Sequence, residues 1–316
     1  MTIAKKVAQL LITIVLVTLF ASFLLVLLPG DPVEVLIPFG SEEQREAVRE
    51  DAGLNDPFLV RYGEWLGGFV QGDLGNYYTV SSIRPVADQV SDALPISLTL
   101  VLEAQILALI IAIPLGVVTA YRSETWFDRM SNTTAFAMLA IPTFALGFLL
   151  QYIFSVELGW FSSVGWTPIT ESLSGHLDKA VLPVITLAVG QIAIYMRLLR
   201  SDMIATLQSD FITMAKAKGL STRRILFRHA LRPSSLTLLT VAGLNVGTLI
   251  GGALIVEVVF SIPGIGLTLA QAIASRQLVA FQSMVAIIAI IYVLVNFGVD
   301  LLYSALDPRI RHARTS

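Results

Sequence analysis

Long runs without a charged side chain are the feature that most constrains how this chain can fold. Four runs of 22 to 27 residues carry no Asp, Glu, Lys or Arg, namely residues 7–28, 130–156, 233–256 and 277–299. About 20 apolar helical residues cross the hydrocarbon core of a bilayer, and a charge at its centre costs about 2.5 to 3.5 kcal/mol. Each run therefore predicts a transmembrane helix.

Two weaker runs bring the predicted number of transmembrane helices to six. Residues 95–121 qualify although Glu103 interrupts them, and residues 180–196 form a 17-residue run followed by Arg197, which must reach the membrane surface. Only 14% of residues are charged and the mean hydropathy is +0.76, whereas about a quarter of a soluble domain is charged. The sequence thus predicts an all-α membrane protein.

A seventh charge-free run, residues 258–275, is interrupted by Pro263, Gly264 and Gly266. Such a break would leave backbone groups without hydrogen bonds in lipid unless protein covers them. We therefore expect a short re-entrant or surface helix here instead of a transmembrane helix.

The distribution of Lys and Arg predicts the orientation of the helices. One set of alternate loops, with the two chain ends, holds 15 basic residues, and the other set holds 6. Positive residues are enriched on the cytoplasmic side, so both termini are expected there. The predicted parts are an N-terminal anchor helix (1–28), an extracytoplasmic subdomain (29–94), a five-helix core (95–306) and a cytoplasmic tail (307–316).

The extracytoplasmic subdomain shows local signals for helices and turns. Ser41 and Gln44 have the spacing of a capping box, and Gly53 is placed to end the helix that the box begins. Residues 58–69 are a second candidate helix, and residues 72–75 (Gly-Asp-Leu-Gly) predict a turn.

Several functions are disfavoured by missing residues. The chain has no Cys and only three His, none paired at ligand spacing, so we predict no metal site. The net charge of −2 gives no basic surface for nucleic acid, and no nucleophile with a base is recognisable. The absence of a Gly-Lys dipeptide excludes a P-loop, so any nucleotide must be bound by a partner.

The most informative segment is the predicted cytoplasmic loop 197–232, which holds eight basic residues against two Asp. Its charge alone fits anchoring at an anionic membrane surface. Its local pattern predicts more: Ser209 or Asp210 can cap a helix that Gly219 ends, and Ser221 can cap a second helix over 222–231. Phe211, Ala215 and Gly219 recur at i, i+4, which predicts one open face where another surface can approach.

Residues 215–220 (AKAKGL) and 228–232 (RHALR) resemble the coupling loop of permease subunits of ABC importers of the oligopeptide and dipeptide (peptide/nickel) class. Further segments resemble that family in the same order along the chain. They are PGDP at 29–32, GDLG at 72–75, VEVVFSIPGIG at 256–266, VDLLY at 299–303 and DPRI at 307–310. The family's coupling motif begins with Glu, whereas this chain has Thr213 at that position.

The resemblance implies the type I importer permease fold, in the plasma (inner) membrane of a prokaryote. It implies a homologous second permease subunit, two ATPase subunits that bind ATP and Mg, and an extracytoplasmic substrate-binding protein. The chain itself would be a permease and not an enzyme, translocating peptides.

The resemblance also implies two sets of functional residues. The ATPase-coupling set, in loop 201–232, comprises Phe211, Ala215, Lys216, Lys218, Gly219, Leu220, Arg223 and Arg224. The outer gate or turn set comprises Glu257, Pro263, Gly264 and Gly266. Glu257 either fixes the re-entrant segment by hydrogen bonding or contacts substrate.

Glu103 is a third candidate, because an intramembrane carboxylate is by default a functional candidate. It either faces the translocation path, or it is buried against a polar neighbour or near the outer interface. An ion- or proton-coupled secondary transporter with Glu103 and Asp300 as relay groups is the alternative function. Within the ABC class, glutathione, nickel and oligosaccharides are alternative substrates.

Overall fold

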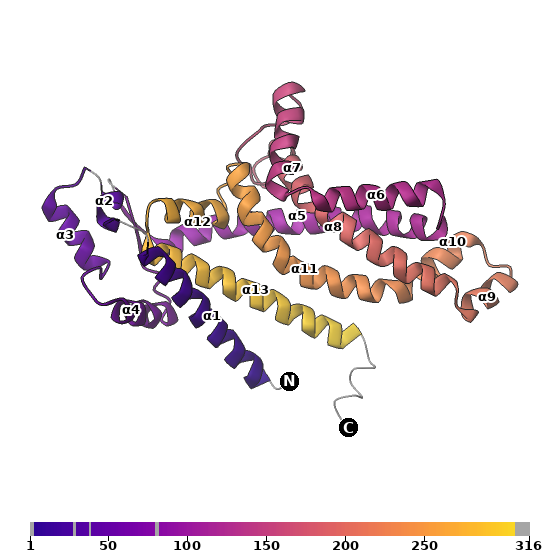
Figure 1. Cartoon of the computed structure of the whole chain (residues 1–316), viewed down its shortest axis with the longest axis horizontal. Coiled ribbons are helices and arrows are strands. Elements are labelled where there is room, and N and C mark those ends of the chain that lie inside the picture. The colour runs from indigo at the N-terminus through magenta and orange to yellow at the C-terminus, as the bar shows by residue number, and fades with distance from the viewer. Residues whose placement is uncertain (1–2, 28–29, 38, 80–81, 307–316) are drawn as a thin grey trace. The chain divides into compact units, whose positions relative to one another are not determined.

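Helices make up most of the computed structural model, which describes residues 3–27, 30–37, 39–79 and 82–306 (Figure 1). The predicted tail, 307–316, lies outside these residues. The chain divides into two units. Unit 1 comprises Met1–Ser97 and Pro263–Leu294, and unit 2 comprises Leu98–Ile262 and Val295–Ser316.

Unit 1 contains the predicted elements of the outer subdomain. Its elements are α1 (Ile3–Val26), α2 (Pro32–Leu36), α3 (Glu42–Asp51), α4 (Phe58–Val70), the hairpin β1 (Asn76–Tyr78) and β2 (Ile83–Pro85), and α12 (Ile265–Ala274). The capping box is confirmed, because Ser41 Oγ accepts from the Gln44 N–H and Gln44 Oε1 accepts from the Ser41 N–H at the start of α3. Gly53 follows α3 with a φ of +62°, as a helix stop requires.

The predicted turn at residues 72–75 packs against the start of α13 (Leu278–Leu306). Gly75 has a φ of +74°, and its N–H donates to Asp73 Oδ1 over 2.9 Å. Ser283 Oγ donates to the Leu74 carbonyl and accepts from Trp65 Nε1. A Cβ at Gly75 would lie 2.2 Å from Cγ1 of Val279, so this turn needs glycine for both its backbone and its space.

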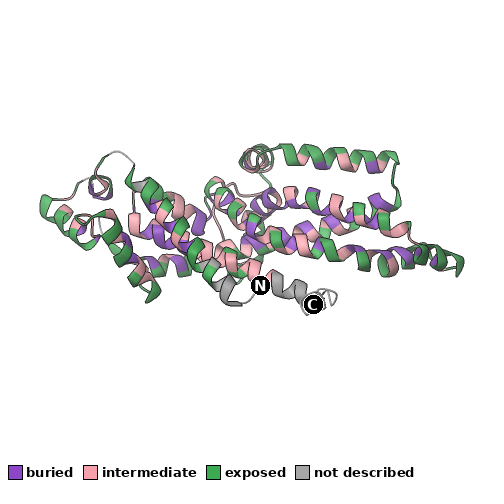
Figure 2. Cartoon of the chain, turned by 60° about the horizontal axis from the view of Figure 1, so that its bottom comes forward, coloured by how far each residue is buried: buried purple, intermediate pink, exposed green. Residues whose placement is uncertain are grey.

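Unit 2 is a helical bundle in which small residues let helices approach closely. On α5 (Val86–Tyr121) the residues that recur every four positions, Ala104, Ala108, Ala112, Gly116 and Ala120, are all buried. Figure 2 shows buried residues, in purple, at intervals along the helices. A Cβ at Gly116 would lie 3.1 Å from Leu199 of α8 (Leu173–Leu207). Close packing of small residues is how membrane helices associate.

Among the described residues, four helices are long and apolar enough to cross a membrane. They are α5, α8, the continuous helix Thr222–Val259 and Leu278–Val299 of α13. A fifth candidate is a bent pair in which α6 (Trp126–Ala140) is followed by α7 (Thr143–Leu150) and the π-helical η1 (Gln151–Glu157).

The run 130–156 is therefore not the single straight helix that the sequence predicts. The helix axis bends by 101° between the two parts of the pair. Ile141 is extended (φ −86°, ψ 121°) directly before Pro142. Proline lacks an N–H and pushes the preceding residue out of the helical region, which explains a break at this position.

A second difference concerns Pro233, where two separate helices are expected. The chain instead stays helical from Thr222 to Val259 through α10 (Thr222–Arg224), the π-helical η2 (Ile225–Ala230) and α11 (Leu231–Val259). Pro233 lies just after the π-helical turn, as the third residue of α11, and local π adjustments allow membrane helices to contain proline. The wider π turn before it supplies the local adjustment.

Candidate functional site

The basic segment 197–232 is more helical in the structure than its description as a loop suggests. α8 continues to Leu207, and α9 (Asp210–Ala217) follows after two residues. Gly219 has a φ of +72°, and its N–H donates to the Lys216 carbonyl, which confirms the predicted left-handed helix stop. Ser209 occupies the cap position of α9, but its hydroxyl donates to the Thr206 carbonyl instead of capping α9.

The residues of the predicted open face do not share one side of α9 in the structure. Ala215 is 7% exposed and lies with Ile212 on the buried side. Phe211 and Met214 are 49% and 58% exposed, so they form the outward apolar face. Their i, i+3 spacing in the sequence is the signal that could have identified Met214.

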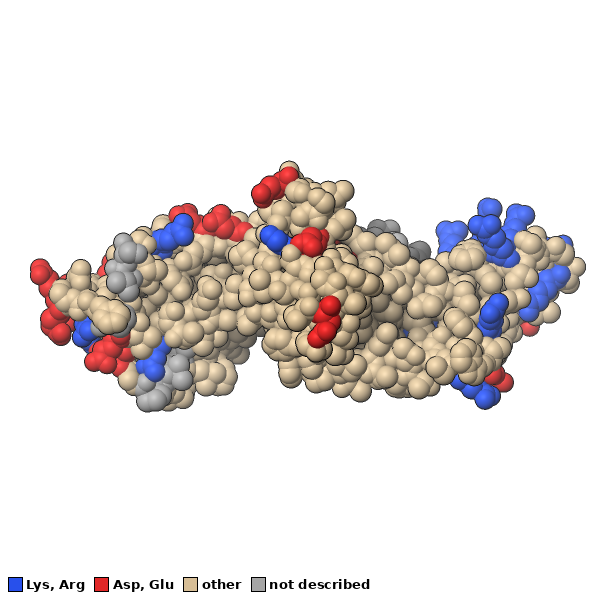
Figure 3. Space-filling model, turned by 90° about the horizontal axis from the view of Figure 1, so that it is seen from above, with Lys and Arg blue, Asp and Glu red and all other residues tan. Residues whose placement is uncertain are grey.

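The remaining coupling candidates lie on or beside this outward face. Lys216, Lys218, Gly219, Arg223 and Arg224 are exposed, and Leu220 is half-buried. Basic side chains gather over the end of unit 2 that carries α9 and α10 (Figure 3). Apart from the residues next to Gly219 in sequence, no described residue lies within 4 Å of the position that a Cβ would take at Gly219. A cavity of about 450 Å³ beside α9 is lined in part by Lys216 and Leu220.

The outer-turn candidates fall in both units. Glu257, fully buried near the end of α11, accepts the Ile262 N–H at its backbone carbonyl over 2.8 Å. The left-handed residue of this segment is Ser261, with a φ of 49°.

In unit 1, Pro263 is exposed, and Gly264 and Gly266 are buried at the start of α12. Gly264 has an extended backbone (φ −96°, ψ −178°), so the turn does not need its left-handed freedom. The Ile265 N–H donates to Ser97 Oγ over 2.9 Å, which satisfies one free donor at the helix start.

Glu103 has a buried polar partner that the sequence did not reveal. Its Oε1 lies 2.8 Å from Nε2 of His176, whose side chain is 3% exposed. Nδ1 of His176 lies 2.8 Å from the Thr167 carbonyl, which can only accept, so Nδ1 carries a proton. The Nε2 to Oε1 contact then needs one further proton, held by either residue. His176 was missed because the predicted helix began four residues later, at residue 180.

A second buried polar cluster joins three helices of unit 2. The Tyr195 hydroxyl donates to Gln105 Oε1 over 3.0 Å, and Gln105 Nε2 donates to the Ala242 carbonyl. Asn245 Nδ2 donates to Gln191 Oε1 over 3.0 Å. Polar groups inside apolar helices are expensive unless paired, which makes this cluster a further functional candidate.

No group of three His, Asp or Glu among the described residues could hold a metal ion. The candidate features are thus an exposed helix with basic and apolar side chains, and buried polar pairs between apolar helices.

A comparison with protein families decides what kind of protein carries these features. The family model for the binding-protein-dependent transport system inner membrane component matches residues 112–312. The chain belongs to this family. The resemblance of its motifs to an ABC importer permease is thereby confirmed, as are the inner-membrane location and the expectation of a transport subunit that is not itself an enzyme.

Relatives of this inner-membrane component cover nearly the whole chain. The oligopeptide transport system permease protein AppB of Bacillus subtilis is 36% identical over 299 residues, covering 94% of both chains. The glutathione transport system permease protein GsiC of Escherichia coli is 32% identical over 311 residues, covering 98% of both. The similarity includes the N-terminal residues that the family model leaves out.

A comparison with solved structures finds a similar fold in an ABC transporter. A chain of the inward-facing MetNI methionine ABC transporter matches with a TM-score of 0.58 at 17% identity, over 69% of this chain and 96% of that one. At this identity the likeness concerns the fold alone.

Proposed function

We propose that this permease is the translocating subunit of an ATP-driven importer of short peptides. The observation that carries the proposal is the full-length similarity to an oligopeptide permease and to a glutathione permease. Glutathione is itself a tripeptide, so a short peptide is the substrate class common to both relatives. Nickel and oligosaccharides have no such support here, and the family disfavours a secondary transporter.

The proposed topology has six transmembrane helices with both termini in the cytoplasm. The 24-residue helix α1 would be the first, the bent pair the third and α13 the last. The bias of 15 basic residues against 6 supports this orientation. It places residues 29–94 outside and α9 inside.

The proposed assembly contains a second, homologous permease, two ATPase subunits that bind ATP and Mg, and an extracytoplasmic binding protein. The outward face of α9, formed by Phe211 and Met214, would be seated on an ATPase subunit. Lys216, Lys218, Arg223 and Arg224 would surround that contact. Closure of the ATPase pair would then move α9 and bias the helices between inward and outward access.

On the outer side, Glu257 and the segment Pro263, Gly264 and Gly266 would shape the gate region. Full burial of Glu257 supports a structural role for its side chain in preference to direct contact with substrate. Glu103 and His176 would tie α5 to α8 in the same way.

The test is uptake of labelled di- to hexapeptides by proteoliposomes that contain the assembled transporter and binding protein. We expect accumulation that requires internal ATP and is insensitive to a proton gradient. Matched vesicles without the ATPase subunits should accumulate no peptide. Uptake driven by a proton gradient alone would contradict the proposal.

A further inference from the structure

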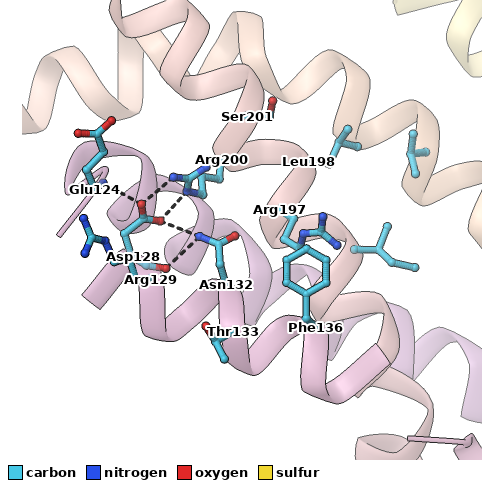
Figure 4. A pocket seen from close by; sticks show the side chains of 12 residues that line it. Glu124, Asp128, Arg129, Asn132, Thr133, Phe136, Arg197, Leu198, Arg200 and Ser201 are labelled. Carbon is cyan, nitrogen blue, oxygen red and sulfur yellow. Dashed lines mark hydrogen bonds and ion pairs between the residues drawn. The ribbon is translucent and has the colours of Figure 1, made fainter. Parts of the chain in front are cut away.

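A groove of about 980 Å³ runs along α8 in unit 2, and none of its lining residues belongs to α9. Figure 4 shows the side chains that line it. We name it the α6–α8 groove. Its lining residues include Arg129, Arg197, Arg200, Phe136, Ile194 and Val241. Its volume is at the upper end of the range for small-molecule sites, about 300 to 1,000 Å³.

One of the three arginines is occupied by an ion pair within the chain. Nε and Nη2 of Arg200 donate to the two carboxylate oxygens of Asp128 over 2.5 and 2.6 Å. Asp128 is 2% exposed and also accepts from Nδ2 of Asn132. The pair therefore neutralises itself and holds α6 against α8.

The other two arginines keep donors available to a ligand. Arg197 stacks over Phe136, with its guanidinium carbon 3.8 Å from the ring centroid. Across the part of the chain that the structure describes, no hydrogen bond or ion pair joins the guanidinium group of Arg129 or Arg197 to another residue. Glu124, the other acidic residue of the groove, lies at the opposite end from Arg197 (Figure 4).

Along α6 the groove passes from Arg129 to Phe136, over which Arg197 is stacked. Arg129 lies in the first turn of α6, close to Trp126, which is 75% exposed and of the type enriched at membrane surfaces. Phe136 is seven residues further along, about 10 Å deeper at 1.5 Å per residue. Phe136, Ile194 and Val241 therefore give the deeper end of the groove apolar surface beside the guanidinium of Arg197.

We propose that the α6–α8 groove binds an anionic phospholipid of the cytoplasmic leaflet. Its phosphate would contact Arg129 or Arg197, and an acyl chain would lie along Phe136, Ile194 and Val241. Basic pockets between membrane helices on the cytoplasmic side recognise acidic headgroups in this way. Asp128 is already paired, so only Glu124 could receive the amine of a zwitterionic peptide, and displacement by peptide is an outcome of the test. The assignment of the lipid to the cytoplasmic leaflet rests on the proposed orientation, whereas the groove itself does not depend on it.

The test is native mass spectrometry of the purified complex with phosphatidylglycerol, without ATP or peptide. At about 1 kcal/mol for each basic residue near the headgroup, Arg197→Gln should weaken lipid retention about fivefold, and Arg197→Gln with Arg129→Gln about thirtyfold. Arg228→Gln removes the same charge from an exposed position outside the groove and should leave retention unchanged. Phosphatidylcholine should be retained weakly by all of them.

Three results would overturn the proposal. The first is equal retention by the wild type and the double variant, provided that both assemble with the same melting temperature. The second is displacement of the lipid by transported peptide, which would assign the groove to substrate. The third is crosslinking of Phe136→Cys to the second permease, which would assign it to that subunit. Lipid retention is measured without ATP or peptide, so its result does not depend on whether the proposed peptide uptake is observed.

Discussion

Two glycines in family-like segments, Gly75 and Gly219, have the same backbone conformation but opposite surroundings. Their φ values are +74° and +72°. A Cβ at Gly75 would lie 2.2 Å from Val279, whereas a Cβ at Gly219 would have no described residue within 4 Å other than its neighbours in sequence. Gly75 is required by packing inside unit 1. The open space at Gly219 is consistent with a surface kept free for a partner.

The largest effect is predicted for a substitution at Gly75, the closely packed glycine. Gly75→Ala should cost about 1 to 2 kcal/mol for the left-handed backbone and about 1 to 3 kcal/mol more for overpacking against Val279. Gly72→Ala is the matched control, because Gly72 has a φ of +92°, but a Cβ there would have no described residue within 4 Å other than its neighbours in sequence. The measurement is the thermal unfolding midpoint of each purified variant. Equal midpoints would show that the Val279 contact carries no weight.

At Gly219, the glycine with open space around it, a bulky substitution is predicted to impair function with little loss of stability. Gly219→Arg and Gly219→Ala share the backbone cost of about 1 to 2 kcal/mol, but only arginine fills the proposed ATPase contact. Overpacking that contact by about 1 to 3 kcal/mol lowers docking affinity about five- to hundredfold. Peptide uptake should therefore fall much more in Gly219→Arg than in Gly219→Ala. Similar uptake by the two would remove the partner from the explanation.

An intermediate effect is expected at the Glu103 and His176 pair. Glu103→Leu leaves Nε2 of buried His176 without its partner, at a cost of about 1 to 3 kcal/mol. In Glu103→Gln the side-chain amide can donate to Nε2 while Nδ1 still donates to Thr167, so most of the stability should remain. Chemical denaturation measures the difference, and equal losses would argue against the proton arrangement inferred here.

A smaller effect is predicted for the pH dependence of unfolding, through Asp31 of the proposed extracytoplasmic subdomain. Burial opposes ionisation of Asp31, but the Val33 N–H and the Arg49 guanidinium, 2.5 Å away, outweigh it and lower the pKa of Asp31. A lowered pKa stabilises the fold above the unfolded value of about 3.9 and ceases to do so as pH falls through the folded pKa. Asp31→Asn should make unfolding less steeply acid-dependent below about pH 4. An unchanged acid profile would show that this ion pair is not linked to folding.

The smallest effect is predicted for Lys216→Glu. Its charge is exposed at the edge of the proposed contact, where single charges contribute about 0 to 1 kcal/mol. Uptake should change less than in Gly219→Arg at physiological salt. A complete loss of uptake would mean that α9 acts through its charge, for example on lipid.

The sequence predicted the elements whose signals are local. The capping box at Ser41 and the helix stop at Gly219 depend on neighbouring residues, and the structure has both. The apolar runs also identified the long helices, because each residue in a run contributes independently to membrane insertion.

The features that were missed depend on tertiary contacts or on proline context. The bend at Pro142 and the continuous helix through Pro233 involve the same residue type with opposite outcomes: the backbone is extended before Pro142, whereas a π turn precedes Pro233. Likewise, the small size of Ala215 suggested an open face, but burial depends on what α9 packs against. The pairing of Glu103 with His176 joins residues 73 positions apart, which no local pattern reports.

The measurement that tests the central claim most directly is site-specific crosslinking from α9. The chain has no Cys, so Phe211→Cys, Met214→Cys or Ala215→Cys each introduces one thiol, which can carry a maleimide photo-crosslinker. The account predicts crosslinks to an ATPase subunit from positions 211 and 214, and few from the buried position 215. Crosslinks from position 215 alone, or none from 211 and 214 in an assembled and active transporter, would contradict it.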